Sequence, residues 1–257
     1  MLTTIDDRAL AFVNFYGVLG ALGQLCARVP AARDLVASDP RPTSIGFAVR
    51  GGPRAALQFA DGGVSVSEGS GRGTITLPFT GPRTFNRVIA GTAKPVPVTG
   101  LTRIPFLTGV FAPLTDLLTR YLRPIPEDLL DQAFRETSTI LTLVVALGSV
   151  AQLASHDRSG RASASLVPDG DLSVRIGDEV SFTLRVHDHA MVFLPAASAS
   201  PRAVLTFRDV ATTRGILDGE LSALACICDG SLAMRGFVPM VDNVSRILDR
   251  AGQYLGE

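Results

Sequence analysis

Two long stretches of the chain contain no charged residue. They are residues 9–27 and 137–155, and apolar side chains dominate both. In the first stretch, small and polar residues recur on one helical face, and the large residues lie opposite; these are Phe12, Phe15, Tyr16, Leu19, Leu22 and Cys26. A repeat of three to four residues is typical of a helix that buries one face. The pattern therefore predicts one long apolar helix in each half of the chain.

Each charge-free stretch is also long enough to cross a membrane. Asn14 and Gln24 interrupt the first stretch, and Gln152 interrupts the second together with several Ser and Thr residues. These polar residues favour packing inside a protein, and a membrane protein with two helical spans is kept as an alternative. The chain starts with MLTTIDDR, which is acidic where an export signal is basic. We therefore expect a cytoplasmic location.

Short runs in which apolar and polar residues alternate predict β-strands. The clearest alternating apolar positions are Phe182, Leu184, Val186, Met191 and Phe193. Turn-forming sequences follow such runs, with ADGG at residues 60–63 and CDGS at residues 228–231, and both are hairpin signals. Strands that are adjacent in sequence and joined by tight turns pair antiparallel. The helices are then left to cover one face of the sheet.

The two halves of the chain repeat the same sequence pattern. ALG at 21–23 matches ALG at 146–148, and ITLPF at 75–79 matches AVLTF at 203–207. Ordered matches at a nearly constant offset indicate two copies of one domain, not a short repeat. Prolines interrupt the pattern in RPIPED, residues 123–128. We therefore predict a first copy at residues 1–124 and a second copy at residues 125–257.

Each copy is predicted to contain the same elements in the same order. These are a long apolar helix, a variable link, three short strands, a helix, one or two more strands and a closing helix. The predicted fold class is α+β, with an antiparallel-rich sheet covered by helices in each copy. Residues 1–128 hold 13 basic and 9 acidic side chains, and the remaining residues hold 11 and 15. Opposite net charges favour packing of the copies as an internal pseudo-dimer, and neither copy has the basic surface that nucleic acid requires.

The first copy departs from the second near its end. TAKPVPVTG at residues 92–100 replaces ELSALACICDG at residues 220–230. Prolines at alternate positions remove backbone donors, so this strand is expected at a sheet edge or in a partly irregular form. We also find no glycine in the first copy that aligns with Gly236. The first copy is therefore interpreted as degenerate.

This order of elements resembles the sterol carrier protein type 2 family. The residues that carry the resemblance are a strand ending in Phe, a helix ending in Gly, a strand, a turn Gly, a strand closing on Gly and a terminal apolar helix. The second copy matches through residues 206–255, and the first copy matches less well through residues 79–122. The resemblance implies a layered sandwich around a hydrophobic tunnel that holds sterols, fatty acyl chains or other lipids. It also implies a carrier or accessory factor and not a catalyst.

Groups able to carry out chemistry are few. His187 and His189 alternate as metal ligands on a strand do, but their counterparts Ala60 and Gly62 lie at a predicted hairpin tip, which indicates a solvated turn. GSGRG at residues 69–73 lacks the spacing of nucleotide-binding loops and is interpreted as a flexible connection. We predict no catalytic residue, no metal site and no cofactor. Three cysteines are interpreted as small buried residues in a reducing compartment, namely Cys26, Cys226 and Cys228.

The remaining argument about function rests on the high content of apolar residues. Mean hydropathy is +0.30 and 19% of residues are charged, which is unusual for two small soluble domains. Met and Phe side chains suit an adaptable lipid pocket, and the alternative is that they fill a solid core. The predicted lipid-binding residues are Phe182, Met191, Phe193, Met234, Phe237, Val238, Met240, Val244, Ile247, Leu248, Phe106 and Phe111.

The predicted function is non-catalytic binding or transfer of a hydrophobic ligand, such as a fatty acyl, isoprenoid or sterol-like lipid. Release would require the closing helix to open, with hinges at Gly236 and Pro239. An accessory or scaffold protein for a lipid or quinone biosynthetic enzyme is the second hypothesis. The expected partner is a hydrophobic small molecule and not nucleic acid. Transient membrane contact and a biosynthetic enzyme partner are kept open.

Overall fold

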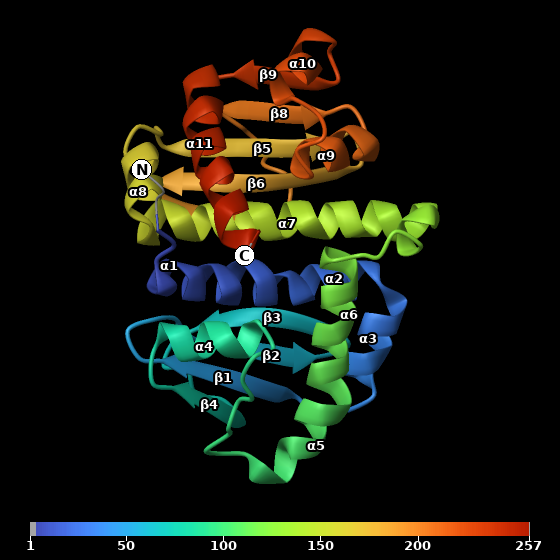
Figure 1. Ribbon diagram of the computed structural model, residues 1–257, viewed down its shortest axis with the longest axis vertical. Helices are drawn as coiled ribbons and strands as arrows, with labels where there is room; N and C mark the ends of the chain where they lie inside the picture. Colours follow the sequence, from blue (N-terminus) through green and yellow to red (C-terminus); the bar gives the residue numbers. More distant parts are fainter. Residues whose placement is uncertain (1–3, 257) are drawn as a thin grey trace. The chain divides into compact units, whose positions relative to one another are not determined.

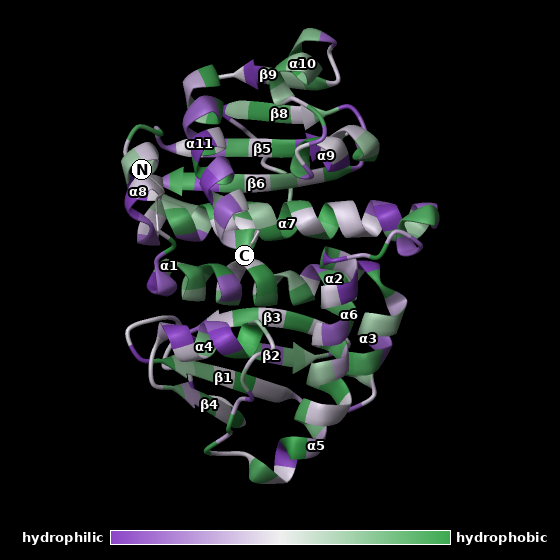
Figure 2. Ribbon diagram, in the orientation of Figure 1, coloured by the Kyte–Doolittle hydropathy of each residue, from purple (hydrophilic) through white to green (hydrophobic). Residues whose placement is uncertain are grey.

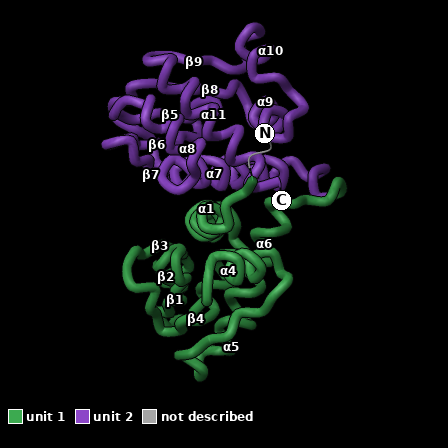
Figure 3. The backbone as a smooth tube through the Cα atoms, turned by 60° about the vertical axis from the view of Figure 1, so that its left-hand side comes forward, with its two compact units in different colours: residues 1–127 green, residues 128–257 purple. Residues whose placement is uncertain are grey.

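Two separate sheets organise the computed structural model, which describes residues 4–256 (Figure 1). The chain divides into two compact units, residues 1–127 and residues 128–257 (Figure 3). Each unit contains one sheet with helices packed on it. The fold class is therefore α+β, with one sheet in each half of the chain.

Unit 1 starts with a helical stretch that changes its winding several times. Its π-helical and 3₁₀ turns lie between two α-helical segments, so the predicted long helix forms but is not uniform. The elements of unit 1 are α1 (Asp7–Phe12), η1 (Val13–Val18), η2 (Leu19–Ala21), α2 (Leu22–Arg28), α3 (Pro30–Ala37), β1 (Thr43–Val49), β2 (Arg54–Ala60), β3 (Gly63–Glu68), β4 (Ile75–Phe79), α4 (Pro82–Ile89), η3 (Leu101–Arg103), α5 (Ile104–Phe106), η4 (Leu107–Phe111) and α6 (Ala112–Leu122).

Unit 2 contains the longest helix of the described chain, α7. The Asp131 side chain caps its start by accepting hydrogen bonds from the backbone N–H groups of Ala133 and Phe134. The elements of unit 2 are η5 (Asp128–Leu130), α7 (Gln132–His156), α8 (Arg158–Ala164), β5 (Gly170–Ile176), β6 (Val180–His187), β7 (Ala190–Leu194), β8 (Ala203–Phe207), α9 (Val210–Leu217), α10 (Ala223–Cys228), β9 (Leu232–Gly236) and α11 (Val238–Leu255).

Both helical stretches predicted from the charge-free sequences pass a length and composition test for membrane spans. They are Asp7–Arg28 and Gln132–His156, and 56% and 83% of their most apolar windows are buried. Core helices of soluble proteins pass the same test.

The first four strands follow the same order in both sheets, and unit 2 adds a fifth strand. The order is β3-β2-β1-β4 in unit 1 and β7-β6-β5-β8-β9 in unit 2. The first three strands of each sheet pair antiparallel, as predicted, but β4 pairs parallel to β1 and β8 pairs parallel to β5. Both sheets are therefore mixed, because the chain crosses the sheet after the third strand and returns in the direction of the first.

The hairpin predicted at residues 60–63 forms between β2 and β3, with Asp61 and Gly62 in left-handed conformations. Its counterpart joins β6 to β7 through Asp188 and His189, which also have positive φ angles. The interpretation of the histidine cluster as a turn is therefore confirmed.

The strand and hairpin predicted around residues 220–231 are wrong. Residues 223–228 form α10, whose start is capped by the Ser222 side chain. Six consecutive small or apolar residues fit a helix as well as a strand, so periodicity could not decide. The helix buries Cys226 and exposes Cys228, and the interpretation of Cys228 as buried is also wrong.

Residues 93–99 of unit 1 are irregular, as the alternate prolines predicted. Thr99 makes one isolated bridge to Thr76 of β4, and the N–H of Val98 donates to the carbonyl oxygen of Thr76 at 3.0 Å. In unit 2 the complete strand β9 pairs with β8 at this place, where Arg235 lies opposite Val204. The sheet of unit 1 thus lacks a regular fifth strand.

Gly100 is the counterpart of Gly236, and the expectation that the first copy lacks this glycine is wrong. A Cβ on Gly236 would lie 2.3 Å from the carbonyl oxygen of Arg202, and a Cβ on Gly100 would lie 2.3 Å from that of Thr74. Both glycines have positive φ, and both contacts fall just before the parallel strand. Only glycine allows so close an approach of two backbone segments.

Replacing Gly236 should therefore destabilise unit 2 more than replacing Gly219. Gly219 has a similar φ of +73°, but nothing lies within 4 Å of an added Cβ. Gly219→Ala should lower the free energy of unfolding by about 1–2 kcal/mol through left-handed strain alone. Gly236→Ala should lower it further, because the backbone at Arg202 must also move. Urea titration followed by circular dichroism measures both, and equal effects would contradict the role given to this contact.

Candidate functional site

One face of the unit 2 sheet is apolar. The strand registers place Val174 of β5 beside Phe182 of β6 and Leu205 of β8. Because side chains alternate between faces, one side of these three strands carries only apolar groups; they are Leu172, Val174, Ile176, Phe182, Leu184, Val186, Ala203, Leu205 and Phe207. Helix α11 contacts β8 and β9 and packs against α7, so it closes this face (Figure 1).

A small cavity lies between this face, α7 and α11. Its lining is apolar except for Ser245, and it comprises Leu143, Leu147 and Val150 of α7, Leu172 and Val174 of β5, Leu205 and Phe207 of β8, and Val241, Val244, Ser245 and Leu248 of α11. Its volume is ≈ 20 Å³, which is room for about one water molecule. An apolar cavity of this size stays empty, and an acyl chain does not fit unless the walls separate.

The predicted lipid-binding residues fall in several places. Val244 and Leu248 line the cavity. Phe182, Met191, Met240 and Ile247 are buried in unit 2, and Phe193 and Met234 are half-buried on its sheet. Phe237 and Val238 are exposed at the start of α11, and Phe106 and Phe111 belong to unit 1. The structure therefore brings together only part of the predicted set around this cavity.

The sequence prediction missed the wall formed by α7. Leu143, Leu147 and Val150 repeat at intervals of four and three residues, which is the signal of one helical face. Only the charge-free stretch as a whole was predicted as a helix, and these three residues were given no role. Which part of a packed helix borders a void depends on side chains from other elements, so the periodicity alone could not reveal it.

Unit 1 fills the equivalent space with aromatic rings. The registers make Phe47 of β1 the counterpart of Val174, since each lies opposite a Leu of the parallel strand. Ring centroids of Phe47 lie 5.3 Å from Phe15, 6.1 Å from Phe85 and 6.4 Å from Phe111. A ring in place of an isopropyl group thus occupies the centre of the unit 1 core.

The C-terminal half of α11 is fastened by a buried polar cluster. The Tyr254 hydroxyl donates to Oδ1 of Asp157 at 2.7 Å, and the Arg250 guanidinium lies 3.2 Å from the same oxygen. The backbone N–H of Gly160 donates to Oδ2 at 2.9 Å. Burial of the Asp157 carboxyl raises its pKa, but these hydrogen bonds and the arginine charge outweigh burial and hold that pKa below its usual range.

The N-terminal end of α11 has no comparable fastening. No side chain caps it, and Phe237 and Val238 are exposed beside Pro239. The N–H of Phe237 donates to the carbonyl oxygen of Arg202, whose guanidinium lies 5.0 Å from the Phe237 ring. These contacts leave the first turn of α11 more weakly held than its last.

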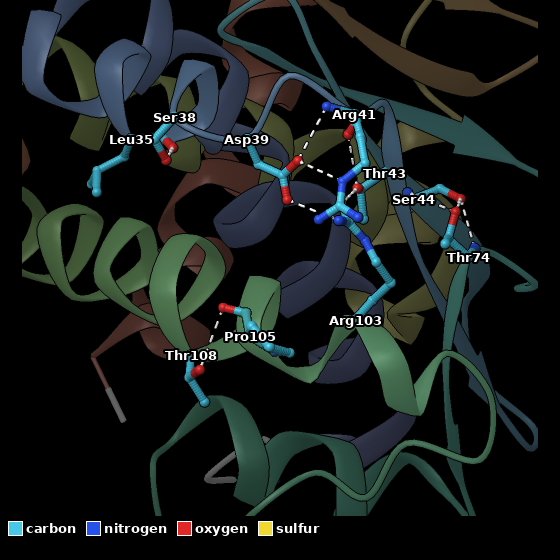
Figure 4. Close-up of polar contacts among 10 residues, drawn as sticks. All are labelled: Leu35, Ser38, Asp39, Arg41, Thr43, Ser44, Thr74, Arg103, Pro105 and Thr108. Carbon is cyan, nitrogen blue, oxygen red and sulfur yellow. Dashed lines mark hydrogen bonds and ion pairs between the residues drawn. The ribbon is translucent and has the colours of Figure 1, made fainter.

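Unit 1 fastens the corresponding position. Arg103, just before α5, forms an ion pair with Asp39 at 2.9 Å and donates to the Thr43 hydroxyl (Figure 4). A hydrogen bond from the Arg41 backbone, together with the Arg41 and Arg103 side chains, lowers the pKa of Asp39 although slight burial opposes this. The ion pair ties the start of the closing helices to the link between α3 and β1, and the hydrogen bond to Thr43 ties it to the start of β1.

The remaining candidate groups do not form a reactive site. Nδ1 of His187 lies 2.9 Å from Asp169 at an exposed hairpin end. Among residues 4–256, no three His, Cys, Asp or Glu side chains come together as metal ligands would. The segment GSGRG, residues 69–73, passes close to β1. A Cβ added to Gly46 of β1 would lie 2.4 Å from the carbonyl oxygen of Gly71 in this segment. The glycines therefore allow this connection to cross closely over β1.

No family model matches the chain, and no curated protein matches it. Solved structures of sterol carrier proteins are similar to part of it. A protein described as "UbiJ-SCP2 Ubiquinone synthesis protein" is 18% identical over 42% of this chain and 96% of its own, with a TM-score of 0.34. A sterol carrier protein domain of Helicoverpa armigera is 9% identical over 44% of this chain and 89% of its own, with a TM-score of 0.36. A structure described as sterol carrier protein 2 is 17% identical over 44% of this chain and 94% of its own, with a TM-score of 0.33. Each of these likenesses covers less than half of this chain.

Removing the Tyr254 hydroxyl should weaken unit 2. Tyr254→Phe removes a hydrogen bond to a buried carboxylate, so the free energy of unfolding should fall by about 1.5–3 kcal/mol at neutral pH. Because the folded-state pKa of Asp157 is lowered, its stabilisation is present above the unfolded pKa of about 3.9 and is lost as pH falls through the lower folded pKa. The difference between wild type and variant should therefore narrow in acid. Denaturant titrations at several pH values measure it, and a difference that does not change with pH would contradict the assignment.

Proposed function

We propose that unit 2 binds a hydrophobic ligand, such as a fatty acyl, isoprenoid or sterol-like lipid, between its sheet and α11. The observation that carries this proposal is the apolar cavity closed by a helix that is fastened at one end only. Apolar ligand surface buried there would contribute about 25 cal/mol per Å² to affinity. The lining offers no acid, base or nucleophile beyond the Ser245 hydroxyl, which supports binding without catalysis.

Binding requires the cavity to open. Ligand pockets typically measure about 300–1,000 Å³, many times the volume between α11 and the sheet. Gly236, with a φ of +82°, precedes α11, and the buried cluster at Asp157 holds the other end. We infer that the first turns of α11 swing away from β8 about that anchored end. The side chains that would then meet the ligand include Val241, Val244 and Leu248.

The two units differ in ways that support a division of roles. Unit 1 carries Phe47 where unit 2 carries Val174, and Arg103 fixes the start of its closing helices. We therefore assign ligand binding to unit 2 and a supporting role to unit 1. Origin of both units from one duplicated domain, and their packing as a pseudo-dimer, remain part of this proposal.

A second candidate is an accessory protein for a lipid or quinone biosynthetic enzyme. The small size of the cavity favours it, because a solid interior suits a protein that acts through its surface. One similar structure is described as a ubiquinone synthesis protein, and that description concerns that protein. The two candidates differ in whether the purified protein carries a lipid.

Filling the cavity should abolish ligand binding. Val174→Phe places a ring in the space that Phe47 occupies in unit 1, so affinity for a fluorescent fatty acid should fall by about tenfold or more. Fluorescence titration measures this loss, and organic extraction with mass spectrometry should find lipid on the wild-type protein only.

Val204→Phe is the matched control. It makes the same change on the neighbouring strand, but the side chain of Val204 points to the opposite face of the sheet. Its affinity should equal that of the wild type. Wild-type protein that yields no lipid and ignores the probe would contradict the ligand-binding proposal and favour the accessory role.

A further inference from the structure

Exposed apolar side chains lie along one edge of unit 2, before and after strand β9. Helix α10, strand β9 and the start of α11 follow one another along this edge, because β9 is the last strand of its sheet (Figure 1). Leu224 and Ile227 of α10 are 71% and 36% exposed, and Phe237 and Val238 are 40% and 48% exposed. We call these four residues, with β9 between them, the edge surface.

The packing of unit 2 does not account for the edge surface. Helix α10 contacts β9 and buries Cys226, while its other residues are exposed. Figure 2 colours this helix as hydrophobic. Single exposed apolar residues are ordinary, but several along one edge, including an aromatic ring, are typical of a contact surface. Unit 1 shows the same tendency at the equivalent edge, where Val96, Val98 and Leu101 are exposed around Gly100.

Two cations accompany the apolar residues. The guanidinium of Arg202 lies over the Phe237 ring, and Arg235 is exposed on β9. Within residues 4–256, neither arginine forms an ion pair with a carboxylate. Of the acids near this edge, Asp229 accepts hydrogen bonds from Ser231, Asp242 pairs with Arg246, and Glu220 is exposed. The Arg202 guanidinium also donates to the carbonyl oxygen of Asp169 at 2.8 Å. Apolar groups beside arginines that have no carboxylate partner complement an interface of acyl chains and anionic headgroups.

We propose that the edge surface docks on an anionic lipid bilayer, with Phe237 and Val238 inserted below the headgroups and Arg202 and Arg235 paired with phosphate. These two apolar residues immediately precede Pro239, and the cavity wall of α11 starts one turn later at Val241. Insertion therefore acts on the more weakly held end of α11 and opens the cavity towards the source of its ligand. The coupling to opening rests on the proposed function, whereas docking itself does not.

Vesicle flotation of the full chain tests docking. Wild-type protein should float with vesicles of equal amounts of phosphatidylglycerol and phosphatidylcholine at low salt, and less with phosphatidylcholine alone. Phe237→Asp should lose most of this binding, and it places a favourable capping residue before α11, so the fold is kept. Arg235→Gln should weaken binding to anionic vesicles by about fivefold.

Leu166→Asp is the matched control, because Leu166 is an exposed leucine of unit 2 that follows α8. It should float like the wild type. Failure of the wild type to float, or equal loss in the Leu166 variant, would overturn the proposal. So would a dimer that forms without vesicles and is broken by Phe237→Asp, since the edge surface would then join two copies of the chain.

The two proposals fail separately. Val174→Phe should lose the fluorescent fatty acid yet still float with anionic vesicles. Protein that takes up the fatty acid and never floats overturns docking and the coupling, and leaves the ligand-binding function standing. Protein that floats without taking up any lipid overturns the ligand-binding function and the coupling, and leaves docking standing.

Discussion

The buried contact of Asp157 with Arg250 and Tyr254 is the constraint on which the arrangement of unit 2 depends. A carboxylate at the junction of α7 and α8 needs partners, because an unpaired buried charge is strongly unfavourable. It finds them on the last helix of the chain, 93 and 97 residues away in sequence. The position of α11 is therefore fixed at its C-terminal end. Its first turns are held mainly by apolar contacts around an incompletely filled space.

The same fold in unit 1 is held in a different way. Its closing helices are fixed near their start by Arg103 and Asp39, and its core is packed with phenylalanine rings around Phe47. The two units differ in two ways. Unit 1 has Phe47 where unit 2 has Val174, and the ion pair of unit 1 (Arg103–Asp39) lies at the start of the closing helices, whereas that of unit 2 (Arg250–Asp157) lies at the end. In unit 1 aromatic rings meet around Phe47, whereas in unit 2 a small cavity lies beside Val174.

Much of the fold could be predicted from the sequence, because it depends on local periodicity. The long apolar helices, the hairpin at Asp61 and Gly62 and the turn at Asp188 and His189 all follow from patterns within a few residues. Helix α10 could not be distinguished from a strand, since six small or apolar residues satisfy both periods. Gly100 was overlooked because the segments before it and before Gly236 differ in length.

The site was harder to predict than the fold. Val244 and Leu248 were identified from the closing helix, but Leu143, Leu147 and Val150 of α7 were not singled out. A void arises where side chains from separate elements fail to meet, and no single segment encodes that outcome. The fastening of α11 through Asp157 was likewise invisible, since nothing in the sequence indicates which aspartate a distant arginine will contact.

The exposed thiol on α10 gives the protein a built-in point of attachment for chemical labels. Burial raises the pKa of Cys26 to about 11, and Cys226 is also buried, whereas Cys228 is accessible at the end of its short helix. A maleimide dye should therefore modify Cys228 selectively in the native chain. Because this residue belongs to the same helix as Leu224 and Ile227, the colour of an environment-sensitive dye attached there would follow the polarity around α10 without any change to the sequence.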